Sequence, residues 1–128
     1  MYKFIVTIIL CLLCPLSVFS TEILEIVDCH IKYEKRYSGG YFGLNANVYV
    51  VTDNYTVPDF YVYLADEEYP GYDISVYRTN SEPSECGEWR FVDDPSKARF
   101  TIKFVDDYDK HFDFRIRYVD SPEKAGVY

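Results

Sequence analysis

The sequence predicts a mostly β protein, built as a small repeat protein of about six short strands that are each followed by a capped turn or a single helical turn. Three observations lead to this prediction. Large apolar residues recur at a nearly fixed step along the chain, apolar and polar side chains alternate around each of them, and a short polar residue closes each segment.

The first twenty residues are set apart from the fold as a targeting segment. Lys3 gives a positive start, an apolar run extends from Phe4 to Leu13, and Ser20 supplies the small residue that signal peptidase requires. We therefore expect residues 1–20 to be a signal peptide, cleaved after Ser20, and the protein to be secreted or periplasmic. The alternative is an uncleaved N-terminal anchor, against which Pro15 and the short apolar run both argue.

Charge narrows the range of partners. The chain carries 21 acidic against 13 basic residues, a formal charge of −8, and loss of Lys3 with the signal peptide makes the remainder one unit more negative. Phosphate backbones repel such a chain, so nucleic acid is excluded as a partner, as is a membrane after signal cleavage.

The repeat begins at Val48 and extends to the last residue, which defines a repeat domain over residues 48–128. Its units start at steps of 13 or 14 residues. The first residues of the units are Val48, Val62, Val76, Trp89, Ile102 and Ile116. Such a period is the mark of one supersecondary unit used repeatedly.

Within each unit the side chains alternate with a period of two. Phe60, Val62 and Leu64 give an apolar face, while Tyr61 and Tyr63 lie on the opposite face. Alternation of this kind, with many aromatic and β-branched residues, is typical of a half-buried strand.

A short polar residue stands four places after the first residue of every unit. Its side-chain oxygen can accept a backbone N–H two or three residues on, which starts a turn and makes a catalytic role less favoured. These turn caps are Thr52, Asp66, Asn80, Asp93, Asp106 and Asp120.

Residues 21–47 fit the repeat less well. The segment Leu24 to Asp28 reads as a strand with a closing aspartate, and residues 37–47, which contain Gly39, Gly40 and Gly43, read as a glycine-rich loop. Two cysteines remain after signal cleavage, Cys29 and Cys86. In an oxidising compartment they form either a disulfide or two small buried residues, and the sequence leaves both open.

The second half of the chain resembles the septoil knot domain family of small repeat proteins. The resemblance covers residues 48–128 and is carried by Gly87-Glu88-Trp89-Arg90-Phe91-Val92-Asp93, by the tandem Phe-Val-Asp and Tyr-Val-Asp strand ends, and by the closing Ala-Gly-Val-Tyr. Residues 78–80 depart from the family pattern, as do two units with an extra residue. The resemblance implies a compact, mostly antiparallel β arrangement that is deeply knotted. Ordinary topology instead favours an unknotted β-solenoid or a small β-sandwich, which stays as the alternative.

Signals for chemistry are weak, and the resemblance brings no enzymatic activity. His30 and His111 lie on different units without a metal-ligand spacing. The acidic stretch 106–113 lacks the glycine and the closing glutamate of a calcium loop. We therefore expect no catalytic residue, no cofactor and no metal.

The leading hypothesis is a non-enzymatic structural or interaction module on a rigid β-repeat framework, with an unknown protein or glycan as its partner. Its interaction face would consist of Tyr61, Tyr63 and Tyr77, since tyrosine is favoured at interfaces; the alternative is that these rings cover a second small core. The competing hypothesis is an extracytoplasmic hydrolase that uses paired carboxylates.

Overall fold

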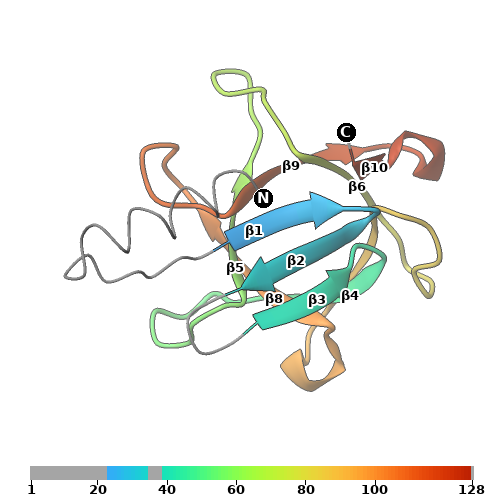
Figure 1. The fold of residues 1–128 in the computed structure, drawn as a ribbon, viewed down its shortest axis with the longest axis horizontal. Helices are drawn as coiled ribbons and strands as arrows, with labels where there is room; N and C mark the ends of the chain where they lie inside the picture. Colours follow the sequence, from blue (N-terminus) through green and yellow to red (C-terminus); the bar gives the residue numbers. More distant parts are fainter. Residues whose placement is uncertain (1–22, 35–38, 128) are drawn as a thin grey trace, which may run out of the picture.

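The computed structural model describes residues 23–34 and 39–127, and the predicted signal peptide lies outside these residues. The fold is mostly β, as the sequence predicts. Six strands form a closed barrel, and a smaller three-stranded sheet lies across one of its ends (Figure 1). The barrel strands are β4 (Ala46–Val50), β5 (Phe60–Leu64), β6 (Ile74–Arg78), β7 (Glu88–Val92), β8 (Phe100–Val105) and β9 (Phe114–Val119).

All six barrel strands run in the same direction. The expectation of a mostly antiparallel arrangement is therefore wrong for the barrel. A tight hairpin reverses the chain within two to five residues, whereas parallel strands need a longer connection that returns to the starting end. Seven or more residues separate most consecutive strands here, for example residues 51–59 between β4 and β5. Each unit therefore enters the barrel from the same end.

The order around the barrel is β6, β7, β4, β8, β5, β9, and pairing of β9 with β6 closes the ring. A short last strand, β10 (Gly126–Val127), runs antiparallel to β6. It pairs with Ile74 and Ser75 of β6, while β7 pairs with Tyr77 and Arg78. β9 occupies one side of β6. β10 and β7 therefore share the other side of β6, and β10 takes a seventh place in the ring, between β6 and β7.

Apart from β6 and β7, which pair directly over two residues, strands that follow one another in the sequence are not neighbours in the barrel. From each strand to the next, in the ring of seven places, the chain passes over one intervening strand and always proceeds in the same direction. The connections lie outside the barrel wall, around its periphery in Figure 1. Their contacts show which strand they cross: Lys103 of β8 donates to the carbonyl of Asp53 in the β4–β5 connection, and the Arg99 amide after β7 donates to the carbonyl of Asn47 in β4.

The interior is filled by the inward face of each strand. The first residues of the six predicted units are all fully buried, as are the aromatic rings that stand two residues before three of them. Phe60, Phe100 and Phe114 meet at the end where the strands begin, with ring centroids of neighbouring pairs 5.6 Å apart. Burying an aromatic or branched side chain of this size contributes about 1.5–3 kcal/mol, so this interior is the main source of stability.

The small sheet closes that same end. It consists of β1 (Ile23–Val27), β2 (His30–Glu34) and β3 (Gly39–Gly43), all antiparallel. Tyr33 and Phe42 place their rings edge-on against Phe60, each with a centroid distance of 5.5 Å. The sequence predicts a loop where β3 lies; pairing with β2 outweighs the low strand preference of its glycines.

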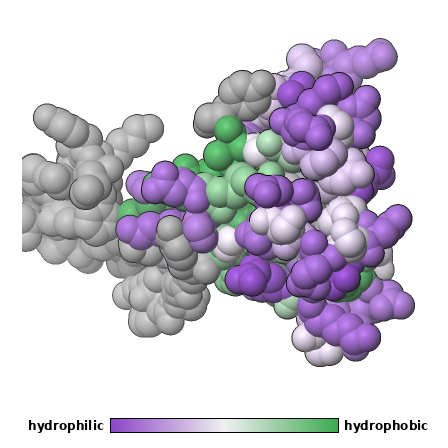
Figure 2. Space-filling view, turned by 90° about the vertical axis from the view of Figure 1, so that its right-hand side faces the viewer, coloured by the Kyte–Doolittle hydropathy of each residue, from purple (hydrophilic) through white to green (hydrophobic). Residues whose placement is uncertain are grey.

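Two 3-10 turns follow barrel strands, η1 (Pro95–Lys97) and η2 (Pro122–Lys124). Proline in the first turn needs no N–H donor, which is why both turns begin with it. In the side view of Figure 2, hydrophobic residues gather in one central region of the coloured surface, and its protruding parts on the right are mostly hydrophilic. No helix in the described part of the chain has the length and apolar character to span a bilayer.

Candidate functional site

The three tyrosines of the predicted interaction face do not lie side by side. Tyr61 and Tyr63 are on β5 and Tyr77 is on β6, but β9 runs between these two strands. Arg115 is the partner of Tyr63 in the register of β9, and Val119 is the partner of Tyr77. Units that follow one another in the sequence are separated in the barrel because the chain passes over one strand at each step.

Tyr63 instead lies at the centre of an aromatic group that two connections build above β5. We call Tyr63, Tyr69, Tyr108 and Phe112 the tyrosine cluster. Its members lie within 6.3 Å of the Tyr63 ring by centroid distance, and Tyr63 is only 5% exposed. The rings of Tyr69 and Tyr108 stack in parallel at 4.0 Å. The β8–β9 connection carries Tyr108 and Phe112 across β5, which is why an outward-facing strand residue becomes buried.

Asp66 fixes the base of the tyrosine cluster. The Tyr63 hydroxyl donates to Asp66 Oδ2 at 2.6 Å, and the Tyr69 amide donates to Asp66 Oδ1 at 2.7 Å. The hydrogen bond to this carboxylate, together with burial, raises the pKa of Tyr63 to about 12. The same hydroxyl, followed by the Tyr69 amide, lowers the pKa of Asp66. The ring position is therefore fixed by a charge-assisted hydrogen bond.

Carboxylates surround the exposed side of the tyrosine cluster. The charge of Glu68 raises the pKa of Tyr69, with burial and the charges of Asp109 and Asp107 adding to it. Glu68, Asp107 and Asp109 are themselves exposed. Two half-buried aromatic rings thus lie beside a group of negative charges. Aromatic faces and carboxylates both attract cations, so the arrangement can bind a positively charged group.

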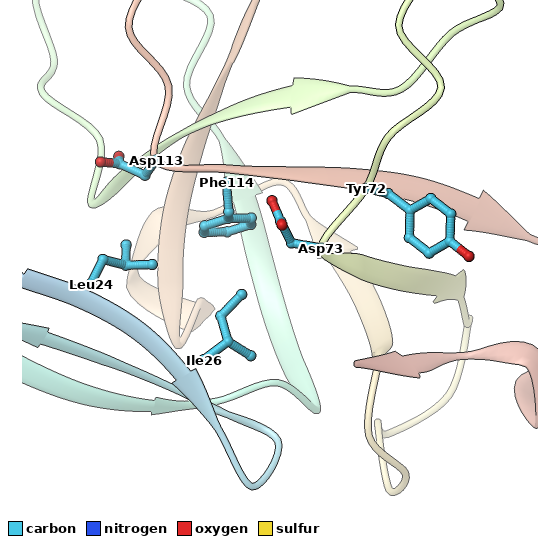
Figure 3. A pocket seen from close by; sticks show the side chains of 6 residues that line it. All are labelled: Leu24, Ile26, Tyr72, Asp73, Asp113 and Phe114. Carbon is cyan, nitrogen blue, oxygen red and sulfur yellow. The ribbon is translucent and has the colours of Figure 1, made fainter. Parts of the chain in front are cut away.

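A separate hollow of about 340 Å³ lies between the small sheet and the barrel. Leu24 and Ile26 point into it from β1 toward Phe114, and Asp73 lies on its other side (Figure 3). Asp113 and Tyr72 complete the lining. This hollow contains two carboxylates, the feature that the hydrolase hypothesis requires.

Both of these carboxylates hold neighbouring strands together. Asp73 Oδ2 accepts from the Arg115 amide at 2.8 Å, and the Arg115 guanidinium binds both oxygens at 3.1 and 2.9 Å. Asp113 accepts from the Tyr61 amide at 2.7 Å. Burial alone would raise the pKa of Asp73, but the hydrogen bonds and charge of Arg115 outweigh it and hold the pKa below its usual value. A general acid needs a raised pKa, so Asp73 is poorly suited to that role.

A third aspartate makes the same contact, and the three share a sequence signal. Asp59 Oδ2 accepts from the Thr101 amide at 2.8 Å. Asp59, Asp73 and Asp113 each stand directly before the first residue of a barrel strand and bind the second residue of the neighbouring strand. These three contacts were not predicted, because the polar residues that follow each strand give the more regular pattern in the sequence.

Comparison with known families identifies the barrel. The family model of the 7(1) septoil knot domain matches residues 45–128, which is about two thirds of the chain. This protein belongs to the septoil knot domain family. No curated protein and no solved structure matches the chain. The septoil knot domain spans β4 to β10, whereas β1, β2 and β3 precede it.

The turns of the septoil knot domain use several capping arrangements. Asp66 accepts the Tyr69 amide, but after β7 the cap is Asp94 rather than Asp93, with the Ser96 amide donating at 2.9 Å. After β8, Asp107 accepts the Asp109 amide, and Asp106 pairs with Lys110. After β9, the N-cap residue is Ser121, and Asp120 pairs with Lys124 at 2.9 Å.

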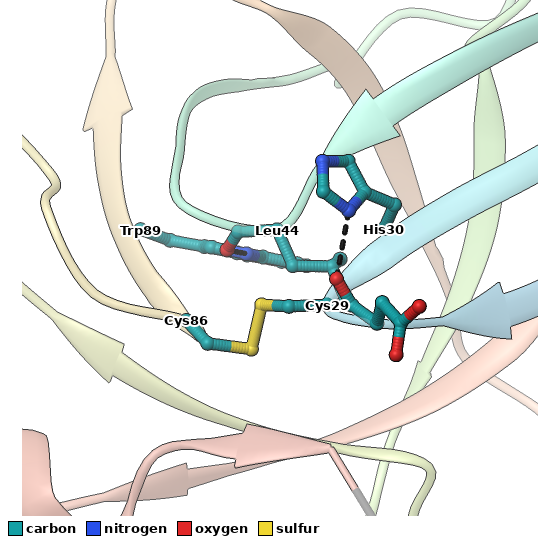
Figure 4. The surroundings of a disulfide bond; sticks show 6 residues. Cys29, His30, Leu44, Cys86 and Trp89 are labelled. Atoms are coloured by element: carbon teal, nitrogen blue, oxygen red, sulfur yellow. Dashed lines mark hydrogen bonds between the residues drawn. A yellow bond between two sulfur atoms is a disulfide. The ribbon is translucent and has the colours of Figure 1, made fainter.

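One disulfide connects the small sheet to the septoil knot domain (Figure 4). Cys29, in the turn between β1 and β2, is bonded to Cys86 just before β7, and their Cα atoms are 5.8 Å apart. Beside it, the Trp89 indole N–H donates to the carbonyl of Leu44 at 3.0 Å. The Nδ1 atom of His30 bonds the carbonyl of Asp28. The residues around the disulfide therefore form contacts that hold the small sheet and the barrel in place.

His111, in the β8–β9 connection, approaches Asp113 at 3.4 Å, whereas His30 is the first residue of β2. Among the described residues, no group of three or more histidine, cysteine, aspartate or glutamate side chains is placed to hold a metal ion.

Proposed function

We propose that this protein is a secreted, non-enzymatic interaction module in which a rigid β framework presents the tyrosine cluster to a partner. The observation that carries the proposal is the stacked pair Tyr69 and Tyr108. These rings come from two different connections, remain half exposed, and rest on the buried Tyr63 ring. Rigid aromatic side chains of this kind lose little conformational entropy when a partner covers them.

The chemistry around the tyrosine cluster favours a basic peptide segment of another protein. Glu68, Asp107 and Asp109 supply negative charge next to the aromatic faces, and the whole chain has a charge of −8. Lysine or arginine side chains gain from both features, through Coulomb attraction and through contact with an aromatic face. Two internal examples use the same contact: Arg117 lies over Tyr72 and Arg78 over Tyr118, each at 4.0 Å from the ring centroid.

The framework owes its rigidity, in this proposal, to a knot in the backbone. The order of the seven places supports it: every step passes over one strand, all steps run in one direction, and the chain proceeds nearly twice around the ring. On its second time around the ring, the chain adds β8, β9 and β10 between strands that it formed on the first. A chain that winds in this way, with all returns outside the wall, is entangled with its own earlier turns.

The binding proposal is tested by titrating the isotope-labelled protein with a short arginine- and lysine-rich peptide and following the ring signals of Tyr69 and Tyr108 by NMR. We expect these signals to shift, and binding to weaken as salt rises. Tyr69→Ala and Tyr108→Ala should each weaken binding at least about tenfold, the loss of roughly 1.4 kcal/mol.

The matched control is Tyr55→Ala, which removes an exposed tyrosine from another connection and should leave binding unchanged. A parallel titration with neutral oligosaccharides separates the two partner classes. The proposal of a basic partner is wrong if the cluster responds only to the oligosaccharide, or if neither ligand shifts the two rings.

A further inference from the structure

The connection between β4 and β5 carries the most exposed aromatic side chain that the structure describes. Tyr55 is 93% exposed and Val57 is 76% exposed, in a loop that spans residues 51–59. Apolar side chains this far in solvent add nothing to the barrel interior. Tyr55 is also the middle residue of Asn54-Tyr55-Thr56, the one Asn-x-Ser/Thr triplet in the sequence.

We propose that Asn54 is the acceptor of an N-linked glycan. The triplet is the recognition sequence of oligosaccharyltransferases when its middle residue is not proline. The inference goes beyond the proposed function: it rests on passage of the chain through the secretory pathway and does not depend on the tyrosine cluster.

The local geometry presents Asn54 at the tip of a fixed turn. Asp53 Oδ1 accepts the amides of Tyr55 at 2.8 Å and of Thr56 at 2.6 Å, and Asp53 Oδ2 accepts the Thr56 hydroxyl at 2.9 Å. Lys103 holds this turn to β8 through the carbonyl of Asp53, at 2.7 Å. The Asn54 side chain takes no part in these bonds and is exposed. A glycan attached there would extend away from the barrel.

The glycan also accounts for the exposed apolar residues beside it. The first sugar would lie against the ring of Tyr55, and the following sugars would shield Val57 from other molecules. Asn54 belongs to the first connection of the barrel, which crosses β8 on the outside of the wall. Because its side chain is exposed, a glycan attached there lies away from the barrel interior.

The transfer balances with one co-reactant, a polyprenyl-diphosphate-linked oligosaccharide. The Asn54 Nδ2 atom forms a bond to the anomeric carbon of the first sugar, and the bond from that carbon to the diphosphate oxygen breaks. The electron pair leaves with the polyprenyl diphosphate, and the amide gives up one proton. No oxidation or reduction takes place.

The test is expression of the full chain in a eukaryotic secretory host, once with its own first twenty residues and once with an established leader in their place. The secreted protein is analysed by intact mass before and after treatment with peptide N-glycosidase. We expect a heavier protein whose extra mass is lost on treatment, with Asn54 converted to aspartate.

Asn54→Gln and Thr56→Ala should abolish the enzyme-sensitive mass completely, whereas Thr56→Ser should retain it. The matched control is Asn80→Gln, which changes another exposed asparagine that lies outside such a triplet and should leave the mass shift intact. Recovery of secreted chain with an unmodified Asn54 overturns the proposal. Failure of both leaders to give modified protein overturns it as well.

Discussion

Single carboxylates decide how neighbouring parts of this barrel are held together. Asp73 binds the amide and the guanidinium of Arg115 on an adjacent strand, and Asp66 holds the hydroxyl of Tyr63. Their hydrogen bonds lower the pKa of both aspartates, so each is charged at neutral pH and binds its partner as an ion. The ionised side chains of these two aspartates therefore help to fix the positions of neighbouring strands and connections.

Tyr63 should titrate at a higher pH than an ordinary tyrosine side chain. Its pKa of about 12 lies above the ordinary value of 10.0, because the hydrogen bond to Asp66 and burial favour the neutral phenol. The stabilising effect is fully present below pH 10 and is lost as pH rises toward 12. A difference titration of tyrosinate absorbance, wild type minus Tyr63→Phe, should show one group near pH 12. A difference curve with its midpoint at the ordinary value of 10.0 would contradict the assignment.

Asp73→Asn should lower the free energy of unfolding at neutral pH by about 1–3 kcal/mol, the usual range for hydrogen bonds to charged groups. The pKa of Asp73 is lowered in the folded protein, so its contribution is present above 3.8 and is lost as pH falls below that value. The stability difference between wild type and variant should therefore shrink in acid. Urea unfolding at several pH values measures it.

Asp93→Asn, at an exposed aspartate, is the control for that series and should change stability little at neutral pH. A difference for Asp73→Asn that is equally large in acid would show that the ionised carboxylate is not the source of the effect.

The strands and turns show what local sequence determines. The alternation of Phe60 and Val62 with Tyr61 and Tyr63 indicated β5 correctly, since side-chain direction in a strand follows from the backbone alone. The burial of Tyr63 could not be predicted in this way. It depends on Tyr108 and Phe112, which a connection 45 and more residues further along the chain brings across β5.

The order of the strands around the barrel also could not be predicted from the sequence. The repeat gives equivalent units, and equivalent units do not show which two will pair. Contacts such as Asp59 with Thr101, 42 residues apart, decide it. The Asp that precedes each of three strands is the signal in the sequence that could have indicated these contacts.

Gly87, directly before β7, lies close to the backbone of both β6 and β10. Its φ of +85° suits glycine, and a Cβ atom would lie 2.5 Å from the Gly126 amide and 2.6 Å from the Ser75 carbonyl. Because both neighbours are backbone, Gly87→Ala must displace β10 from β6, and we expect a loss of about 3–5 kcal/mol. Thermal unfolding followed by circular dichroism measures this.

Gly126→Ala separates the effect of backbone strain from the effect of steric overlap with neighbouring strands. Gly126 also has a positive φ, +135°, but a Cβ atom there meets nothing within 4 Å. It should therefore cost only the backbone strain of a non-glycine residue in this region, about 1–3 kcal/mol. Equal losses in the two variants would show that the close approach of the three strands is not limiting.

The disulfide joins two elements that are 57 residues apart in the chain. Closing a loop of this length restricts the unfolded chain and contributes about 4 kcal/mol in the loop-entropy description. The Cys29→Ala, Cys86→Ala double variant should lose stability by up to that amount, as measured by guanidinium unfolding. Reduction of the wild-type protein should give the same loss without a substitution. A variant as stable as the oxidised protein would contradict this prediction.

For the whole molecule, the proposed knot predicts slow kinetics. Chain that winds nearly twice around the ring must be withdrawn past its own earlier turns, which raises the barrier to unfolding more than the equilibrium stability. With the disulfide removed, the protein should unfold in guanidinium more slowly than unknotted domains that have the same free energy of unfolding. The chain newly synthesised in a cell-free system should also fold more slowly than denatured protein whose knot persists.

Deletion of residues 125–128, which removes β10 from the seventh place, is the control for the knot. The truncated protein should unfold faster than its lower free energy of unfolding alone would predict. Identical folding rates for new and previously folded chain would rule out a persistent entanglement.

The pairing of β6 with β9 completes the barrel wall and has a consequence for self-association. Fibrils grow where a sheet offers a row of unpaired amide and carbonyl groups to another chain, and among the described strands the closed wall has no such border. The small sheet is different, because β1 and β3 are its outer strands. If this protein polymerises, growth should therefore start from β1 or β3 and leave the barrel intact.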